Sequence, residues 1–225
     1  MALSHVRERS LTALVIIAAI ELFIVAPLSA TNHAPYALVG TVIAANVLVV
    51  LAIVWGNVPA IVAVALASAV EIAAIVLRIL RPSTRTETLD FAAAFVLIVA
   101  LTVVLGLTVF GPGRVTVHRI LGAIAIYLNA GTAFALAYRM VDALGPNAFA
   151  ATLAGSSPAH SIADFVYFSF ATLTTAGYGD IVPVNAFARS LANVEAVIGQ
   201  LFPATLLARL MTLHLEDRRA ERPRD

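Results

Sequence analysis

The sequence contains 225 residues, of which 61% are hydrophobic and only 12% are charged, and its mean hydropathy is +0.96. Soluble domains carry about 25% charged residues, so this composition predicts a membrane protein. The net charge of +1 indicates nothing about nucleic acid, and no basic stripe with interleaved aromatic residues occurs. The absence of cysteine excludes disulfides, thiolate metal sites and thiol nucleophiles.

The first two membrane-spanning helices are predicted near the N-terminus. Residues 11–28 form an apolar run that follows two arginines. The run is longer than the core of a signal peptide, carries Glu21 and lacks small residues spaced for cleavage, so we expect a spanning helix. A second helix is expected over residues 36–55, because Gly56-Asn57-Val58-Pro59 is a strong turn signal.

Residues 60–80 and 91–110 predict the third and fourth spans, joined by a polar linker at 82–90. The fourth helix contains no arginine or lysine. Moving one charge across the membrane field contributes about 2.3 kcal/mol per 100 mV, so an uncharged helix predicts weak voltage dependence. Three arginines near the linker are interpreted as loop anchors, because Pro82 interrupts their helical spacing. They are Arg78, Arg81 and Arg85.

Gly111-Pro112-Gly113 is a turn signal that divides the chain into an N-terminal four-helix domain, residues 1–110, and a second domain, residues 111–225. The first domain resembles a sensor domain in its helix count alone. In the second domain, residues 115–141 predict a fifth span. Residues 142–160 are interpreted as a loop, because glycine, serine and proline break the segment too often for it to span.

A short helix is predicted directly after this loop, whose last residue, His160, is interpreted as exposed. Ser161 offers a helix N-cap, and Asp164 three residues later completes an acidic variant of the capping box. The helix is therefore expected to start at Ile162 and to continue to Leu173.

A glycine-rich strip, Thr174-Thr175-Ala176-Gly177-Tyr178-Gly179-Asp180, follows the short helix. A dehydrated cation needs oxygen ligands, and a narrow tube of main-chain carbonyls supplies them in successive rings. Turning neighbouring carbonyls the same way requires alternating left- and right-handed backbone, and Gly177 and Gly179 adopt positive φ without a Cβ penalty. Thr175 adds a hydroxyl oxygen at one end.

The strip and its apolar surroundings resemble the selectivity-filter signature of the potassium-channel family. The resemblance implies that the short helix is a re-entrant pore helix, that Tyr178 points away from the ion as a strut, and that Asp180 lies at the outer mouth. Valine is usual in the family where this chain has Ala176, so side-chain packing behind the filter is reduced. The implied K+ sites are the carbonyls of Thr175, Ala176, Gly177, Tyr178 and Gly179, with Thr174, Asp180 and Glu195 as support.

A sixth span is predicted over residues 188–213, followed by an arginine-rich tail at 215–225. Gly199 and Pro203 interrupt this helix, and proline removes one backbone hydrogen bond, so a bend near Phe202 is expected. One interpretation is a gating hinge. A static kink or a small-residue contact between helices is the other.

Three glutamates fall inside predicted spans, where an ionised carboxylate costs at least a few kcal/mol. Glu195 lies at the depth of the strip, where it can hydrogen-bond the pore helix from behind. Glu21 and Glu71 lie in the first domain, and their role is open between function and polar contact between helices. Asn46 and Asn129 are candidate partners for these acids.

These elements combine into an all-α membrane protein with six spanning helices, a pore helix and a filter loop. An even number of spans puts both termini on one side, which the positive-inside rule makes the cytoplasmic side of a multi-pass cell-membrane protein. The linker arginines at 78, 81 and 85 disobey this rule. The arginines that obey it are Arg7, Arg9, Arg114, Arg119, Arg218, Arg219, Arg222 and Arg224.

The sequence therefore predicts a passive potassium-selective channel without strong voltage gating. One filter loop per chain cannot enclose a pore, so a homotetramer within membrane lipid is expected. A weakly selective cation channel is the nearest alternative, and a secondary transporter or non-conducting subunit is another, although no second copy of the strip occurs.

No catalytic motif is present, so no enzyme activity is expected. No cofactor, nucleic acid or soluble ligand domain is expected either, and K+ is the transported ion. The gating stimulus is not indicated.

Overall fold

The computed structural model describes residues 2–25, 27–28, 36–53, 56–111, 117–145, 148–151 and 161–220. Several of the sequence predictions concern residues outside these ranges. They are the start of the fifth helix, Pro112, Gly113, Arg114, His160 with most of its loop, and residues 221–225. The helices are α1 (Ala2–Ile20), the π-helical η1 (Glu21–Val25), α3 (Tyr36–Ile53), α4 (Val58–Leu80), α5 (Thr84–Val109), α6 (Val117–Leu144), α7 (Ile162–Leu173) and α8 (Ala186–Ala220). The strands are β1 (Phe149–Ala151) and β2 (Ile181–Pro183).

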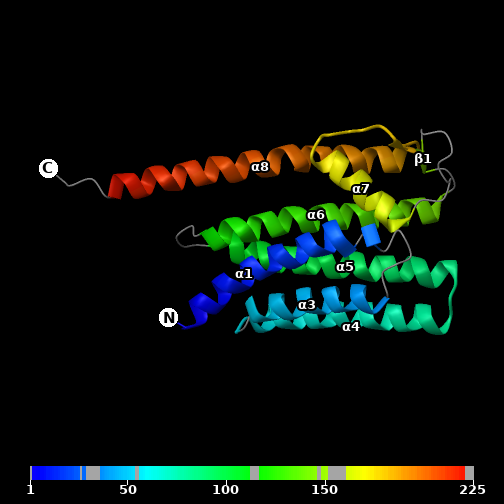
Figure 1. The fold of residues 1–225 in the computed structure, drawn as a ribbon, viewed down its shortest axis with the longest axis horizontal. Coiled ribbons are helices and arrows are strands. Elements are labelled where there is room, and N and C mark those ends of the chain that lie inside the picture. Colours follow the sequence, from blue (N-terminus) through cyan, green and yellow to red (C-terminus); the bar gives the residue numbers. More distant parts are fainter. Residues whose placement is uncertain are drawn as a thin grey trace.

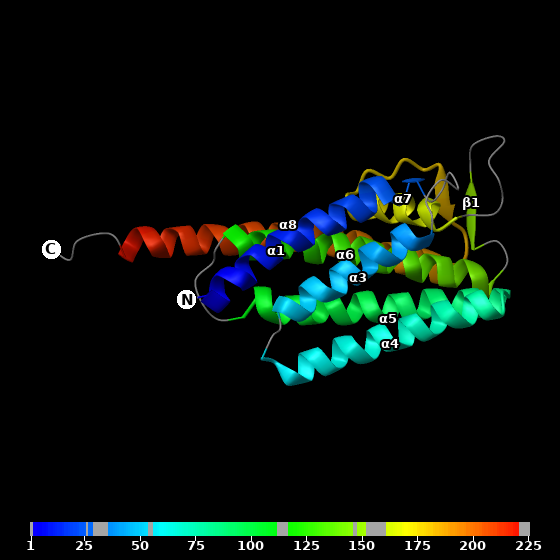
Figure 2. The same ribbon diagram turned by 60° about the horizontal axis from the view of Figure 1, so that its bottom comes forward.

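The long helices lie side by side, and α4 and α8 form opposite edges of the molecule (Figure 1). α5 packs between α4 and α6, while α1 packs on α6 and α3. α7 is wedged between α6 and α8. The start of α1 and the end of α8 lie toward one end of the bundle, and β1 lies at the other, as the rotated view also shows (Figure 2). The strip leads from α7 to β2, which pairs with β1 at that other end.

Two apolar clusters hold the bundle together. The larger one joins α1 and α3–α6 around side chains such as Val64 and Leu105, which are almost completely buried. The smaller one is aromatic and joins α6, β1 and α7. In it, Phe149 meets Phe165 with ring centroids 4.9 Å apart, and Tyr138 meets Phe168 at the same distance, both edge to face. Such pairs stabilise by about 0.5–1.5 kcal/mol beyond their buried area, so they fix α7 against β1 and α6.

The expectation of a polar linker over residues 82–90 is wrong, because α5 already begins at Thr84. Ser83 caps this helix: its Oγ accepts from Thr86 N at 3.2 Å, and its own N donates to Thr86 Oγ1 at 3.0 Å. The extra helical turns place Asp90 opposite Arg78 of α4, with 2.6 Å between the charged groups. Arg78 is therefore an interhelical ion pair and not a loop anchor.

Other helix ends also lie beyond the expected positions. α1 starts at Ala2 instead of residue 11, α6 ends at Leu144 instead of 141, and α8 runs from Ala186 to Ala220 instead of 188–213. Arginine and glutamate are good helix formers, so polar flanking residues continue a helix that apolar periodicity delimits too tightly. Asn185 fixes the start of α8, since its Oδ1 accepts from Ala188 N at 2.7 Å.

Four helical segments are long and apolar enough to cross a membrane among the described residues. They are Val58–Leu80, Thr84–Val109, Arg119–Leu144 and Ala186–Ala208. The first two predicted spans are represented by the shorter apolar helical segments Ser10–Val25 and Ala44–Ile53. The expected total of six spanning helices is thus supported for four of them.

Candidate functional site

The strip, residues 174–180, has an alternating backbone. Thr175 has a φ of +61°, Gly177 of +54° and Gly179 of +78°, whereas the residues between them do not enter this region. The two glycines adopt the left-handed conformation that their positions predicted. Thr175 was not expected to do so, because a β-branched residue is disfavoured there. Every second residue from 175 to 179 is therefore left-handed, which is the alternation that a row of carbonyl ligands requires.

The backbone N–H groups of the strip are directed toward α7. Three of them donate to carbonyl oxygens in the last turn of that helix, which would otherwise lack partners. These bonds fix the direction of the backbone at the α7 end of the strip. The bonds are Thr174 N to Phe170 O at 3.0 Å, Thr175 N to Thr172 O at 2.9 Å and Gly177 N to Ala171 O at 3.0 Å.

The far end of the strip is held by aromatic stacking. The Tyr178 ring lies against the Tyr167 ring of α7, with centroids 5.8 Å apart and only 11° between the planes. The Tyr167 hydroxyl also hydrogen-bonds Asp180. Asp180 Oδ1 in turn accepts from Ile181 N at 3.1 Å, at the start of β2. Both ends of the strip are thus attached to α7, which itself starts at the predicted Ser161–Asp164 capping box.

Glu195 of α8 supports α7 from behind, as the sequence predicted. Its Oε1 lies 2.5 Å from Ser169 Oγ, and its Oε2 accepts from the Tyr138 hydroxyl at 2.5 Å. All three side chains are fully buried. Ser169 Oγ is also 2.7 Å from the carbonyl oxygen of Gly131 on α6. The partners are therefore Ser169 and Tyr138 and not Asn129, and the cluster joins α6, α7 and α8.

The number of protons in this cluster constrains Glu195. Three short oxygen–oxygen contacts need three protons, but the Ser169 and Tyr138 hydroxyls supply only two, and the carbonyl of Gly131 supplies none. A carboxyl group that keeps its proton supplies the third. An ionised carboxylate would also be costly at this depth, so hydrogen counting and desolvation agree on a neutral Glu195.

Gly199 allows α8 to approach the base of the strip. A Cβ atom at this position would lie 2.0 Å from the carbonyl oxygen of Leu173, the last residue of α7. The same oxygen accepts a hydrogen bond from the Tyr127 hydroxyl of α6 at 3.1 Å. α8 continues without interruption through Gly199 and Pro203. Gly199 thus has a packing role that does not depend on hinge motion.

The other two glutamates that the sequence singled out lie in the first domain. Asn46 Nδ2 donates to Glu21 Oε2 at 3.0 Å, which is the pairing the sequence suggested. Glu21 opens the π-helical turn η1, which apolar periodicity does not reveal. Glu71 and Asp90 are buried, and each keeps one oxygen without a hydrogen-bond partner. Among the described residues no group of three potential metal ligands occurs.

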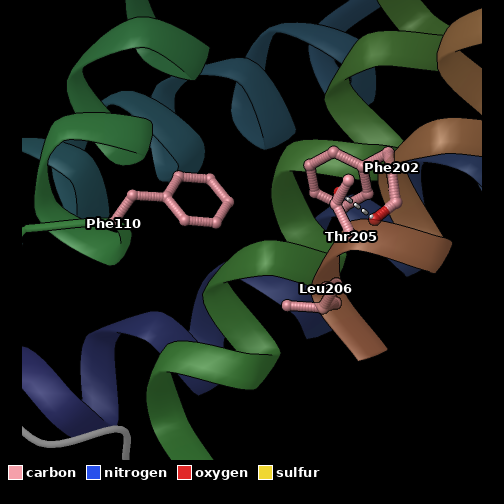
Figure 3. A pocket seen from close by; sticks show the side chains of 4 residues that line it. All are labelled: Phe110, Phe202, Thr205 and Leu206. Atoms are coloured by element: carbon pink, nitrogen blue, oxygen red, sulfur yellow. Dashed lines mark hydrogen bonds between the residues drawn. The ribbon is translucent and has the colours of Figure 1, made fainter. Parts of the chain in front are cut away.

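An apolar cavity of about 240 Å³ lies between the end of α5 and α8 (Figure 3). Phe110, Phe202, Thr205 and Leu206 line it. The Phe202 ring meets Phe110 at 6.4 Å and also contacts Tyr127 at 5.7 Å between centroids. The cavity therefore lies beside Pro203 and offers no charged group for an ion.

Comparison with known protein families gives a match for the part of the chain that contains the strip. Residues 124–215, from α6 through the strip into α8, match a family model described as "Ion channel". This segment is an ion-channel domain. The resemblance to a channel family is confirmed over these residues, and the chain is a multi-pass membrane protein.

One curated relative is Protein LctB of Geobacillus stearothermophilus, which is 34% identical over 88 residues. The alignment covers 38% of this chain and 63% of that protein, so the chain spans less than two thirds of the relative's length. No solved structure matches the chain.

Replacing Glu195 tests the neutral cluster. Glu195→Gln offers one donor and one acceptor in the same place, so thermal stability of the purified protein should stay near that of the wild type. Glu195→Ala leaves the buried Tyr138 hydroxyl without a partner and Ser169 with only the Gly131 carbonyl. An unsatisfied buried group costs about 1–3 kcal/mol, so the melting temperature should fall clearly. Equal damage from both variants would show that the carboxyl acts as an anion instead.

Replacing Gly199 tests the close approach of α8. Gly199→Ala forces a methyl group into the Leu173 carbonyl and should destabilise the protein by about 1–3 kcal/mol, as overpacking does. Gly106→Ala on α5 is the matched control, since a Cβ there meets nothing within 4 Å. Thermal unfolding of both variants measures the difference, and a Gly199→Ala protein as stable as the control contradicts the packing role.

Proposed function

We propose that the protein is a passive channel that conducts K+ through the carbonyl oxygens of residues 175–179. The supporting observation is the left-handed backbone at every second residue of the strip. Three N–H groups of the strip bond to α7, and we infer that the carbonyls of the strip replace the water around a cation. Ala176 and Tyr178 contribute carbonyls like their neighbours, and Thr174 and Asp180 support the two ends.

The proposal includes a homotetramer. In one chain residues 174–179 are all exposed, although they carry polar backbone at membrane depth, where lipid cannot satisfy it. Only 11% of the apolar segment Ala186–Ala208 is buried, against 39% for Arg119–Leu144. Four copies around a cyclic axis would cover this face and enclose the strip, with lipid around the outside. Among the side chains of α8 that the structure describes, the large apolar ones that are exposed are Phe187, Val194, Val197, Ile198, Leu201 and Leu207.

If the strip is the ion path, the two domains of the chain have different roles. We propose that residues 111–225 form the pore domain and that residues 1–110 form a peripheral four-helix domain. The shared direction of the start of α1 and the end of α8 supports placing both termini on one side. The arginine distribution favours the cytoplasm of a cell-membrane protein for that side.

Ion selectivity is tested by reversal potentials of the purified protein in a lipid bilayer. With K+ on one side and Na+ on the other, the potential should lie near that expected for K+ alone. Gly177→Ala should abolish conduction, because a φ of +54° costs an ordinary residue about 1–2 kcal/mol, and Gly106→Ala should conduct normally. Similar permeability to both ions would favour a weakly selective channel, and flux coupled to a second ion would favour a transporter.

We propose that gating is not strongly voltage-dependent and that Pro203 acts as a hinge. α5 carries only Arg85 in its first turn and no basic residue deeper in the helix, so little charge can move in the field. Pro203 lies inside α8, where it removes one backbone hydrogen bond.

Single-channel recordings across a voltage series should therefore show an open probability that changes little with voltage. Pro203→Ala should alter that probability at every voltage. Steep voltage activation of the wild type would contradict the first statement. Unchanged gating in the variant would contradict the second.

A further inference from the structure

One polar contact links α8 directly to the strip. Gln200 Nε2 donates a hydrogen bond to Thr175 Oγ1 at 3.1 Å. The two residues are 25 positions apart in the sequence, and both are exposed in a single chain. Neither the carbonyl row nor the support from Glu195 accounts for this contact.

The backbone geometry makes the contact a defined one. Gly199 brings α8 against the carbonyl of Leu173, and the Tyr127 hydroxyl holds the same carbonyl from the other side. Gln200 is the next residue along α8, so its side chain starts beside the base of the strip. The amide therefore reaches Thr175 from a rigid support rather than from a loop.

The two threonines of the strip are held in different ways. Thr174 Oγ1 donates to Phe170 O at 2.6 Å, so this hydroxyl is bound to α7. Thr175 has a left-handed backbone, and its hydroxyl is bound by Gln200. A hydroxyl oxygen has two lone pairs, so a bond from the amide leaves one lone pair for a cation.

We propose that Gln200 is a positioning residue that fixes the Thr175 hydroxyl and thereby contributes to the preference of the strip for K+ over Na+. A hydroxyl that rotates freely can follow a smaller ion, whereas a hydroxyl held by an amide keeps the spacing that suits the larger one. The inference rests on the K+ conduction proposed above. It adds a selectivity determinant that lies outside the strip, on α8.

The test is a double-mutant cycle between the two side chains. Gln200→Met keeps the length of the side chain and removes the donor. Thr175→Val keeps the β-branch, and so the backbone preference, and removes the hydroxyl. Thr175→Ser keeps the hydroxyl. Each single and double variant is reconstituted, and the K+ to Na+ permeability ratio is measured from reversal potentials.

Gln200→Met should lower the permeability ratio by about fivefold, which is the size of one neutral hydrogen bond. The same substitution should have no further effect in the Thr175→Val background and its full effect in the Thr175→Ser background. A merely structural role would reduce the current carried by every cation and leave the ratio unchanged. Thr205→Val is the matched control on α8, because Thr205 Oγ1 bonds only within its own helix, to Leu201 O at 2.8 Å and Phe202 O at 3.0 Å.

Variants that carry too little current are compared by ion binding instead. The concentration of K+ or Na+ that half-maximally protects the purified protein against thermal unfolding gives the same ratio without conduction. An unchanged ratio in Gln200→Met, or effects of the two substitutions that simply add, overturns the role of Gln200. A wild type that does not prefer K+ overturns the proposed function instead, and the coupling between Gln200 and Thr175 is still measured on the ions that are carried.

Discussion

Backbone polar groups at membrane depth need partners, and this requirement organises the second half of the molecule. The strip satisfies it asymmetrically: N–H groups at 174, 175 and 177 bond to the end of α7. Under the proposed function, the carbonyl oxygens of the strip find their partner in the conducted ion. The left-handed residues at every second position make this asymmetry possible, since without them successive N–H and C=O groups would alternate in direction.

A shell of specific contacts keeps the strip in this unusual conformation. Aromatic pairs fix α7 against α6, and Glu195 joins Ser169 to Tyr138 in a fully buried cluster. Gly199 lets α8 close on the last carbonyl of α7. Strained backbone persists only where its surroundings over-determine it, and here three helices do so. Gln200 belongs to the same shell through its hydrogen bond to the Thr175 hydroxyl.

Sequence patterns predicted local structure correctly at positions where one residue type has a single dominant structural role. Ser161 and Asp164 cap α7 as predicted, and Gly177 and Gly179 take positive φ. They failed at helix ends, because hydropathy measures the apolar run and not the polar turns that extend it, as the start of α5 at Thr84 shows. The interpretation of Arg78 as a loop anchor also failed. Its ion-pair partner Asp90 lies in α5, whose early start the sequence did not predict.

The sequence by itself determined that the chain is a membrane protein with a glycine-rich strip between helices, because charge content, apolar length and glycine spacing are local properties. Only the tertiary structure decided which side chains surround that strip. The left-handed φ of Thr175, the two hydroxyls around Glu195 and the reach of Gln200 all depend on how α6, α7 and α8 pack. Contacts between residues that are dozens of positions apart produce no periodic pattern in a single sequence. Such contacts can therefore be identified only from the way the helices pack.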